Sequence, residues 1–283
     1  MAYDMTVKPL GRLGNRIALL LTGIWMAERY QGRVQVGQLV AGHPLIANVP
    51  AVFDFNTNQR PLQSMKVEWQ KFPGYQRPWP PEGDAGRIMQ TYVVPHLTMP
   101  SFAAEEFVLN IRSGDIFTNP SFFKQGWSGV AGKYFCPPPL SYYAGIIERE
   151  QPKRIVVVSS DHSNPVIPAL LKRYPEAEFF HQGVEADFGK VASARTLVMS
   201  YSSFTESAFL ASRQVERCYS MFIGHMLRDD VQRIEYQDKA FVEKPWDSPA
   251  ERDDDLLNWK FKGEFIEYPA GRDGETKSST GMS

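Results

Sequence analysis

Four short polar segments of this 283-residue chain carry side chains suited to binding an anion. They read GRLGNR at 11–16, NIRSGD at 110–115, SSDH at 159–162 and SYSSFTES at 200–207. Each follows a strand-like stretch and leads toward a helical pattern. Because ligands of open α/β sheets bind outside the carboxyl ends of the strands, function is to be sought in these segments.

The segment 11–16 has the composition of a strand-to-helix turn that lies close to a ligand. Gly14 lets the backbone approach closely, and the start of a helix attracts anions. The side chains of Arg12 and Asn15 add hydrogen-bond donors. The alternative is a turn with a purely geometric purpose.

The segment 110–115 places Arg112 directly after an apolar strand pattern. A guanidinium is always charged, and its planar fork matches phosphate oxygens. We therefore predict that Arg112 grips the diphosphate of a ligand; the alternative is a surface ion pair between Arg112 and Asp115. Asp115 is a candidate general base, or a carboxylate that orients Arg112.

The other two segments combine carboxylate and hydroxyl groups. Asp161 is placed to accept from a ribose hydroxyl or a base N–H, or else to cap the helix that starts near Asn164. Ser202 and Ser203 offer hydroxyl and N–H groups at the positive end of a helix, followed by Phe204. N-capping accounts for one of these serines, but not for the whole polar cluster.

Strand and helix patterns alternate along the chain and predict an α/β protein with parallel sheets. Strands are expected at 33–36, 107–111, 154–158, 178–180 and 196–200, and helices at 16–30, 140–150, 165–174, 187–194 and 203–213. The run RIVVV at 154–158 is typical of a strand buried on both faces. Residues 56–101 are rich in Pro, Gly, Gln and aromatic residues, which predicts little regular structure.

Two stretches that each begin with a strand and a glycine-containing turn predict two Rossmann-like lobes facing across a cleft. The expected lobes are residues 1–103 on the acceptor side and 104–245 on the donor side. Residues 246–283 are expected to form a polar tail that is disordered at its end.

Composition limits the classes of function. With 31 Lys and Arg against 32 Asp and Glu, the net charge of −1 gives no electrostatic footprint for nucleic acid or an anionic membrane. The most apolar early stretch, 17–27, is shorter than the roughly 20 residues that span a bilayer, and no signal peptide is recognisable. These features predict a soluble, cytoplasmic protein.

Motifs for metals and common cofactors are missing from the sequence. Cys136 and Cys218 form no CxxC pair and favour buried free thiols, and the five histidines are scattered without an HExxH spacing. The phosphate loop GxxxxGK(S/T) and the dinucleotide turn GxGxxG are also missing, which disfavours phosphoryl- or sulfotransfer enzymes and dehydrogenases. No DxD motif follows a strand, so we predict neither a metal nor a cofactor.

In order and position the four segments resemble the motifs of the GT-B fucosyltransferases with two Rossmann lobes. These include α1,2- and α1,6-fucosyltransferases, nodulation fucosyltransferases and protein O-fucosyltransferases. Segment 11–16 looks like their GRxGNQ turn, and 110–115 looks like their HxRRxD motif, with Arg112 as the arginine that contacts the β-phosphate of GDP-fucose. Segment 187–204 resembles the last motif, whose serines bind the diphosphate, and Asp161 falls where the family has an acidic residue near the guanosine. Asn110 and Ser113 depart from the pattern, replacing a histidine and the second arginine.

The resemblance implies an inverting, metal-independent glycosyltransferase that moves a sugar, first of all fucose from GDP-fucose, onto a glycan hydroxyl. The implied donor-binding residues are Arg12, Gly14, Asn15, Asn110, Arg112, Asp161, Ser202, Ser203 and Phe204. Because the second arginine is missing, GDP-mannose or a UDP- or dTDP-sugar is an alternative donor. A non-catalytic protein that binds a nucleotide sugar or a sulfated glycan would use the same groups, but it would not hydrolyse the donor.

The glycan acceptor is expected to contact the N-terminal lobe and its aromatic loop. Trp69, Tyr75 and Trp79 are the side chains suited by type to stack on sugar rings.

Overall fold

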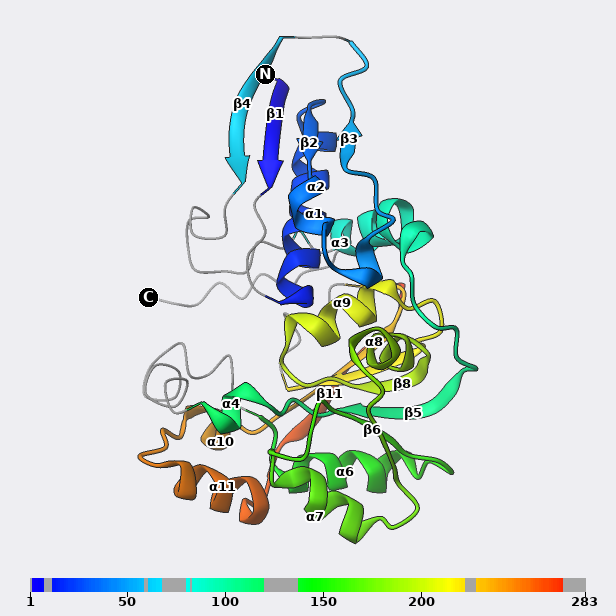
Figure 1. The fold of residues 1–283 in the computed structure, drawn as a ribbon. Coiled ribbons are helices and arrows are strands. Elements are labelled where there is room, and N and C mark those ends of the chain that lie inside the picture. The colour runs from blue at the N-terminus through cyan, green and yellow to red at the C-terminus, as the bar shows by residue number, and fades with distance from the viewer. Residues whose placement is uncertain are drawn as a thin grey trace.

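The computed structural model of the protein describes residues 2–7, 12–58, 61–67, 80–81, 83–119, 137–221 and 228–271. Two sheets lie one above the other along the length of the molecule, and helices α8 and α9 lie between them (Figure 1). Helices α6 and α7 cover the opposite face of the second sheet (Figure 1). The predicted α/β class is confirmed.

The first sheet has the strand order β3-β2-β1-β4. Its strands are β1 (Ala2–Val7), β2 (Arg33–Gln35), β3 (Val52–Asp54) and β4 (Leu62–Val67). Strand β1 pairs in parallel with β2 and β4, and β3 runs antiparallel to β2. The helical elements of this part are α1 (Leu13–Arg29), α2 (Gly37–Val40), η1 (Pro44–Ile46), α3 (Asp84–Ile88), the π-helical turn η3 (Met89–Val93) and η4 (Val94–His96).

The second sheet has the order β11-β10-β9-β8-β5-β6-β7. Its strands are β5 (Glu105–Asn110), β6 (Val156–Val158), β7 (Glu178–Phe180), β8 (Ala194–Val198), β9 (Arg217–Ser220), β10 (Gln232–Gln237) and β11 (Glu264–Tyr268). All neighbours pair in parallel except β10 and β11. The helices are α4 (Asp115–Thr118), α6 (Leu140–Glu150), α7 (Val166–Arg173), α8 (Val184–Ala192), α9 (Ser203–Ala211), α10 (Lys239–Glu243) and α11 (Pro249–Asn258).

Three sequence predictions need correction. Residues 56–101 contain β4, α3 and η3, so their Pro- and Gly-rich composition did not prevent regular structure. Helix α8 begins at residue 184, because Gly183, with φ of 98°, ends the preceding turn. Residues 246–283 are not simply a polar tail, because α11 and β11 belong to the second lobe: Leu256 is fully buried and Phe265 stacks on Tyr236 at 4.0 Å between ring centroids.

Part of the hydrophobic core is shared by both lobes. One cluster of buried side chains extends from Met5 and Ile17 in the first lobe to Leu197 and Phe209 in the second. Helix α1 is buried over most of its surface because it packs on the first sheet and also on α9. The lobes therefore meet in a close-packed contact, and the division at residue 103 stays a prediction.

The lobes approach each other closely at Gly14, in the first turn of α1. A Cβ atom added there would lie 2.3 Å from the carbonyl carbon of Ser203 and 2.4 Å from the backbone nitrogen of Phe204. These are backbone atoms at the start of α9 and cannot move aside independently. Only glycine allows this contact.

We therefore expect Gly14→Ala to destabilise the protein by about 1–3 kcal/mol, the usual cost of overpacking. The measurement is the midpoint of urea unfolding. Gly37→Ala is the matched control, since its Cβ would meet only the Cβ of Ala51 at an ordinary 3.4 Å. Equal midpoints for Gly14→Ala and the unmodified protein would contradict the contact.

Candidate functional site

The order of the second sheet reverses between β5 and β8. From β5 the chain adds β6 and β7 on one side, then returns to place β8 on the other side of β5. A reversal of this kind leaves a crevice at the carboxyl ends of the two strands, which is the usual ligand position in open α/β sheets. Arg112 follows β5, and Ser202 and Ser203 follow β8, so the predicted anion-binding residues lie at the carboxyl ends of these two strands.

Two contacts join the 11–16 segment of the first lobe to the second lobe. The hydroxyl of Ser203 donates to the side-chain oxygen of Asn15 at 2.7 Å. Arg12 forms an ion pair with Asp115, with 3.2 Å between Nη2 and Oδ2. Gly14 provides the backbone contact described above. The structure thus brings the candidate residues of three segments to one place.

The second-lobe segments are also joined to one another. Arg112 donates from Nη1 to the carbonyl of Tyr201 at 3.3 Å, which ties the 110–115 segment to the turn before α9. Ser113 donates to the carboxylate of Asp161 at 2.5 Å and accepts from the backbone N–H of Asn164 at 2.9 Å. All four segments chosen from the sequence are therefore linked by contacts.

The N-terminal ends of α1 and α9 converge at this site. Ser202 caps α9 by accepting from the backbone N–H of Thr205 at 3.1 Å, whereas Arg12, the N-cap of α1, provides no side-chain cap. Each helix N-terminus carries a partial positive charge of about half an elementary charge. Two such ends and the guanidinium of Arg112 form a local environment that favours an anion.

The sequence left two roles open for Asp161, binding a ligand or capping a helix, and its hydrogen bonds bear on both. Oδ1 accepts from the hydroxyl of Ser113 and from the backbone N–H groups of Gly114 at 3.3 Å and Ser163 at 2.8 Å. Partial burial opposes ionisation, but the hydrogen bond from Ser113 and those from Ser163 and Gly114 outweigh it and lower the pKa of Asp161. This carboxylate fixes the turn that carries Arg112. Asn164 performs the helix capping, because its Oδ1 accepts from the N–H of Val166 at 2.9 Å.

Asn110 and Phe204, two of the predicted donor-binding residues, are packed inside the protein. Asn110 is only 5% exposed, and its amide is hydrogen-bonded to neighbouring strand ends. Phe204 is partly buried and meets Phe188 edge to face at 5.7 Å between centroids. Ser113, which replaces the second arginine of the motif, is also buried. These residues therefore hold the strand ends and turns that carry the candidate site, through hydrogen bonds and packing.

Sequence reasoning did not identify Thr205 and Tyr201. Thr205 is fully buried and links the cap of α9 to Asn110, and the carbonyl of Tyr201 accepts from Arg112. The signal for Thr205 was available, since Ser202 and Thr205 have the N-cap to N3 spacing. The carbonyl of Tyr201 could not be predicted in this way, because every residue has a backbone carbonyl.

Several sequence predictions lie outside the described residues: Gly11, Trp69, Tyr75, Trp79 and Cys136. Cys218 is a buried free thiol, as predicted, and burial raises its pKa. Within the described ranges, no group of three or more His, Cys, Asp or Glu side chains is arranged to hold a metal ion. In the same ranges, no helix combines the length and apolar character needed to cross a membrane.

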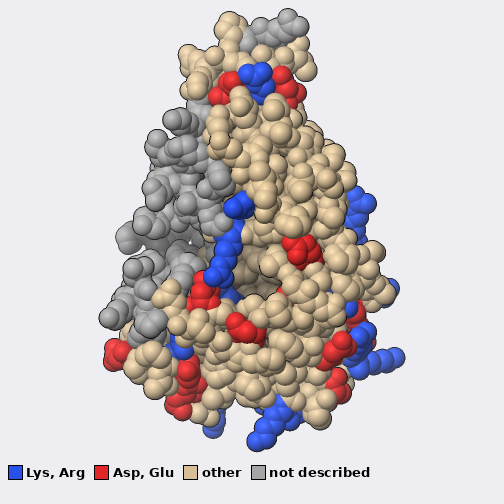
Figure 2. Space-filling model, in the orientation of Figure 1, with Lys and Arg blue, Asp and Glu red and all other residues tan. Residues whose placement is uncertain are grey.

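On the face drawn in Figure 2 the surface is hollowed near the middle of the molecule. Basic and acidic side chains border this hollow (Figure 2). The lobes are joined by the ion pair between Arg12 and Asp115 and by the hydrogen bond between Asn15 and Ser203.

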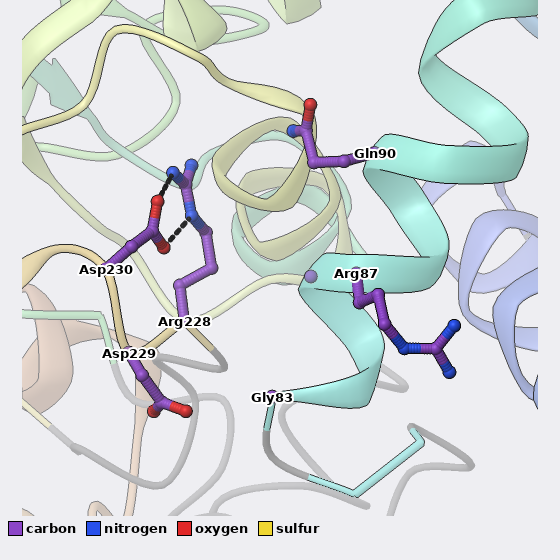
Figure 3. Close-up of a pocket in the computed structure, with 7 residues that line it drawn as sticks. Gly83, Arg87, Gln90, Arg228, Asp229 and Asp230 are labelled. Atoms are coloured by element: carbon purple, nitrogen blue, oxygen red, sulfur yellow. Dashed lines mark hydrogen bonds and ion pairs between the residues drawn. The ribbon is translucent and has the colours of Figure 1, made fainter. Parts of the chain in front are cut away.

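A separate pocket of roughly 280 Å³ lies at the other end of α9 (Figure 3). It is lined by Gly83, Gly86, Arg87, Gln90, Arg228, Asp229 and Asp230. Arg228 is paired with Asp230 and donates to the carbonyls of Phe209 and Ser212 at 3.0 and 2.6 Å. Gln90 donates to the carbonyl of Leu210 at 2.7 Å. These side chains hold the C-terminal end of α9, and none of the predicted site residues lines this pocket.

Comparisons with known proteins gave matches among solved structures alone, since no family model and no curated protein matches this chain. The chain is similar to POFUT1 in complex with GDP, with a TM-score of 0.44 and 12% identity over 77% of this chain and 97% of that one. It is also similar to NodZ alpha-1,6-fucosyltransferase soaked with GDP-fucose, with a TM-score of 0.46 and 12% identity over 95% of this chain and 100% of that one. At these identities and TM-scores, neither match supports a conclusion on function or substrate.

The lowered pKa of Asp161 has a testable consequence for stability. A carboxyl whose pKa is lower in the folded than in the unfolded protein stabilises the fold above its ordinary value of 3.8, and this contribution is lost as the pH falls through the folded pKa. We expect Asp161→Asn to be less stable than the unmodified protein at neutral pH. The difference should shrink below pH 3.8.

The measurement is urea unfolding of both proteins across this pH range. The other carboxylates contribute equally to the pH dependence of stability in both proteins, so their contribution cancels in the difference between the two free energies of unfolding. A difference that stays constant as the pH falls would show that ionisation of Asp161 does not support the turn.

Proposed function

We propose that this protein is a glycosyltransferase that uses a nucleotide-sugar donor, with GDP-fucose as the first candidate. The observation that supports this most is the convergence of Arg112 with the N-terminal ends of α1 and α9 at the reversal point of the second sheet. A nucleotide sugar presents two adjacent phosphates, and the site offers a guanidinium, serine hydroxyls and two positive helix ends for them. The order of the four motifs supports a GDP-linked sugar.

In this proposal the nucleotide is bound mainly by residues 104–245, and the acceptor approaches from residues 1–103. An acceptor hydroxyl attacks the anomeric carbon on the face opposite the diphosphate. The bond from that carbon to the diphosphate oxygen breaks as the new glycosidic bond forms, so the configuration inverts. The electron pair of the broken bond stays on the departing diphosphate.

The charge that develops on the diphosphate determines what the residues must do. Arg112, the Ser202–Ser203 turn and Asn15 are the groups we assign to stabilise it, in the place where other transferases use a metal. Fixed donors aimed at developing charge commonly lower a barrier by several kcal/mol, with roughly 3–4 kcal/mol for one donor. The turn that carries Arg112 is fixed by Asp161 through Ser113, Gly114 and Ser163, which makes its guanidinium suited to this role.

Asp115 is the candidate for the base that accepts the proton of the attacking hydroxyl. It is the carboxylate of the 110–115 segment that faces the first lobe, where it pairs with Arg12. The pair gives Asp115 a second possible purpose, the joining of the lobes. The ion pair needs Arg12, whereas a base needs only the carboxylate of Asp115.

Nucleotide binding is the first property to test. We expect GDP, at about 100 times its dissociation constant, to stabilise the protein by about 2.7 kcal/mol in a thermal-shift measurement. Arg112→Ala should abolish this shift because the diphosphate loses its guanidinium. UDP, CMP and dTDP are compared in the same panel.

The matched control is Arg173→Ala, which removes an arginine that pairs with Glu148 at 2.7 Å on the helices covering the opposite face of the sheet. It should keep the GDP shift. Stabilisation by another nucleotide would keep the transferase and replace the donor. No shift with any of the four nucleotides would overturn the donor site.

The role of Asp115 is tested by the hydrolysis of GDP-fucose, with water in place of the acceptor. If Asp115 is the base, Asp115→Asn should slow GDP release by about 100-fold or more while GDP affinity is kept. Arg12→Ala keeps the carboxylate, so it should retain most of the rate when GDP-fucose is saturating, even if donor binding is weakened. Equal losses in both variants would instead assign Asp115 to the interlobe ion pair, and an unchanged rate in Asp115→Asn would exclude it as the base.

A further inference from the structure

The buried side chain of Asn110 connects several strand ends around the candidate site. Its Nδ2 donates to the carbonyl of Val158 at the end of β6, at 3.2 Å. Its Oδ1 accepts from the hydroxyl of Ser200, which follows β8, at 2.8 Å, and also from the hydroxyl of Thr205. One amide therefore ties the ends of three neighbouring strands to the first turn of α9.

Thr205 is the partner that extends this network to the cap of α9. It is fully buried, and its hydroxyl lies 2.8 Å from the hydroxyl of Ser202. Its backbone N–H donates to the same Ser202 hydroxyl at 3.1 Å. A single threonine thus holds both the N-cap of α9 and the amide of Asn110.

This network fixes the distance between the two parts of the anion site. Asn110 ends β5, and Arg112 follows it on the same turn; Ser202 and Ser203 start α9. Arg112 also reaches across to the carbonyl of Tyr201. A shift of α9 relative to β5 would therefore move the serines away from the guanidinium.

Packing alone does not require this arrangement. Asn110 and Thr205 are 5% and 0% exposed, and a buried polar group costs free energy unless its hydrogen bonds are complete. Apolar side chains of similar shape would fill the same space without that cost. What the polar network adds is one defined geometry, because each hydrogen bond restricts both distance and direction.

We propose that Thr205, acting through Asn110, is a positioning residue that sets the serine turn of α9 against Arg112 for the diphosphate of the donor. This inference rests on the proposed function. Thr205 itself does not touch the diphosphate, and its effect is transmitted through Asn110 and Ser202.

The test compares Thr205→Val, which keeps the shape and removes the hydroxyl, with Thr205→Ser, which keeps the hydroxyl. The probe is GDP, with its dissociation constant measured by calorimetry. We expect Thr205→Val to raise this constant about tenfold, the effect of weakening one hydrogen bond to a charged group. Thr205→Ser should restore binding to within about threefold of the unmodified protein, a loss smaller than that of one such bond.

Ser193→Ala is the matched control. It also removes a buried hydroxyl, which donates to the carbonyl of Lys190 at 2.8 Å, but it lies at the amino end of β8. It should lower the melting temperature and leave GDP affinity unchanged. If Thr205→Val lowers stability to the same extent and also leaves GDP affinity unchanged, Thr205 is merely structural and the inference is overturned.

A double-mutant cycle with Arg112→Lys, which keeps a positive charge for the diphosphate but loses the guanidinium, then tests the route of the effect. Without the guanidinium, the placement of the serine turn against it matters less, so Thr205→Val should weaken GDP binding much less in that background than in the unmodified one. Independent, additive losses would overturn the inference. If Thr205→Val does not fold, Ser200→Ala, which removes the other hydroxyl donor to Asn110, takes its place with the same expected sign.

The experiments distinguish a failure of the proposed function from a failure of the positioning role of Thr205. No binding of GDP by the unmodified protein overturns the proposed function. Normal binding by both the unmodified protein and Thr205→Val overturns the positioning role and leaves the proposed function in place.

Discussion

The backbone contact at Gly14 presses the first turn of α1 against the first turn of α9. Two helix N-termini repel each other electrostatically, because each carries a partial positive charge. The apolar cluster shared by the lobes, from Ile17 to Phe209, holds them together in spite of this repulsion. An anion placed between the helix ends would relieve the repulsion. The same contact that joins the lobes therefore creates an electrostatic environment that favours an anion.

Helix α9 is held by hydrogen bonds at both ends. Asn15 and Ser202 fix its start, while Gln90 and Arg228 donate to carbonyls at its end. Gln90 comes from the first lobe, so both lobes share the helix along its whole length. Electrostatic stabilisation of a departing group works best when the donors need no reorganisation during the reaction. The pocket around Arg228 is then part of the support of the site, at a distance from its chemistry.

The sequence predicted the α/β class and the segments of the site, because both depend on local patterns: apolar runs, glycine turns and polar strand ends. It did not predict β4 or β11, whose residues have weak local preferences and are stabilised by pairing with β1 and β10. It also missed the short helix α3, which packs on α1 and α9. It also left the role of Asp161 open, because a carboxylate at a strand end can bind a ligand or a turn. The structure shows that Asp161 holds the turn, since its carboxylate accepts from Ser113, a residue 48 positions away in the chain, and from Gly114.

Ser113 stands where the resembled motif has its second arginine, and its buried surroundings suit a small hydroxyl side chain. A hydroxyl there is buried and bonded to Asp161, so it fixes the turn and adds no charge to the site. A further cation beside Arg112 is Arg12, whose side chain is 80% exposed in its pair with Asp115. Exposed ion pairs contribute about 0–1 kcal/mol, so exchanging this carboxylate for a diphosphate costs Arg12 little. The same exchange would release Asp115 from its cation at the moment the donor is bound, which is when a base is needed.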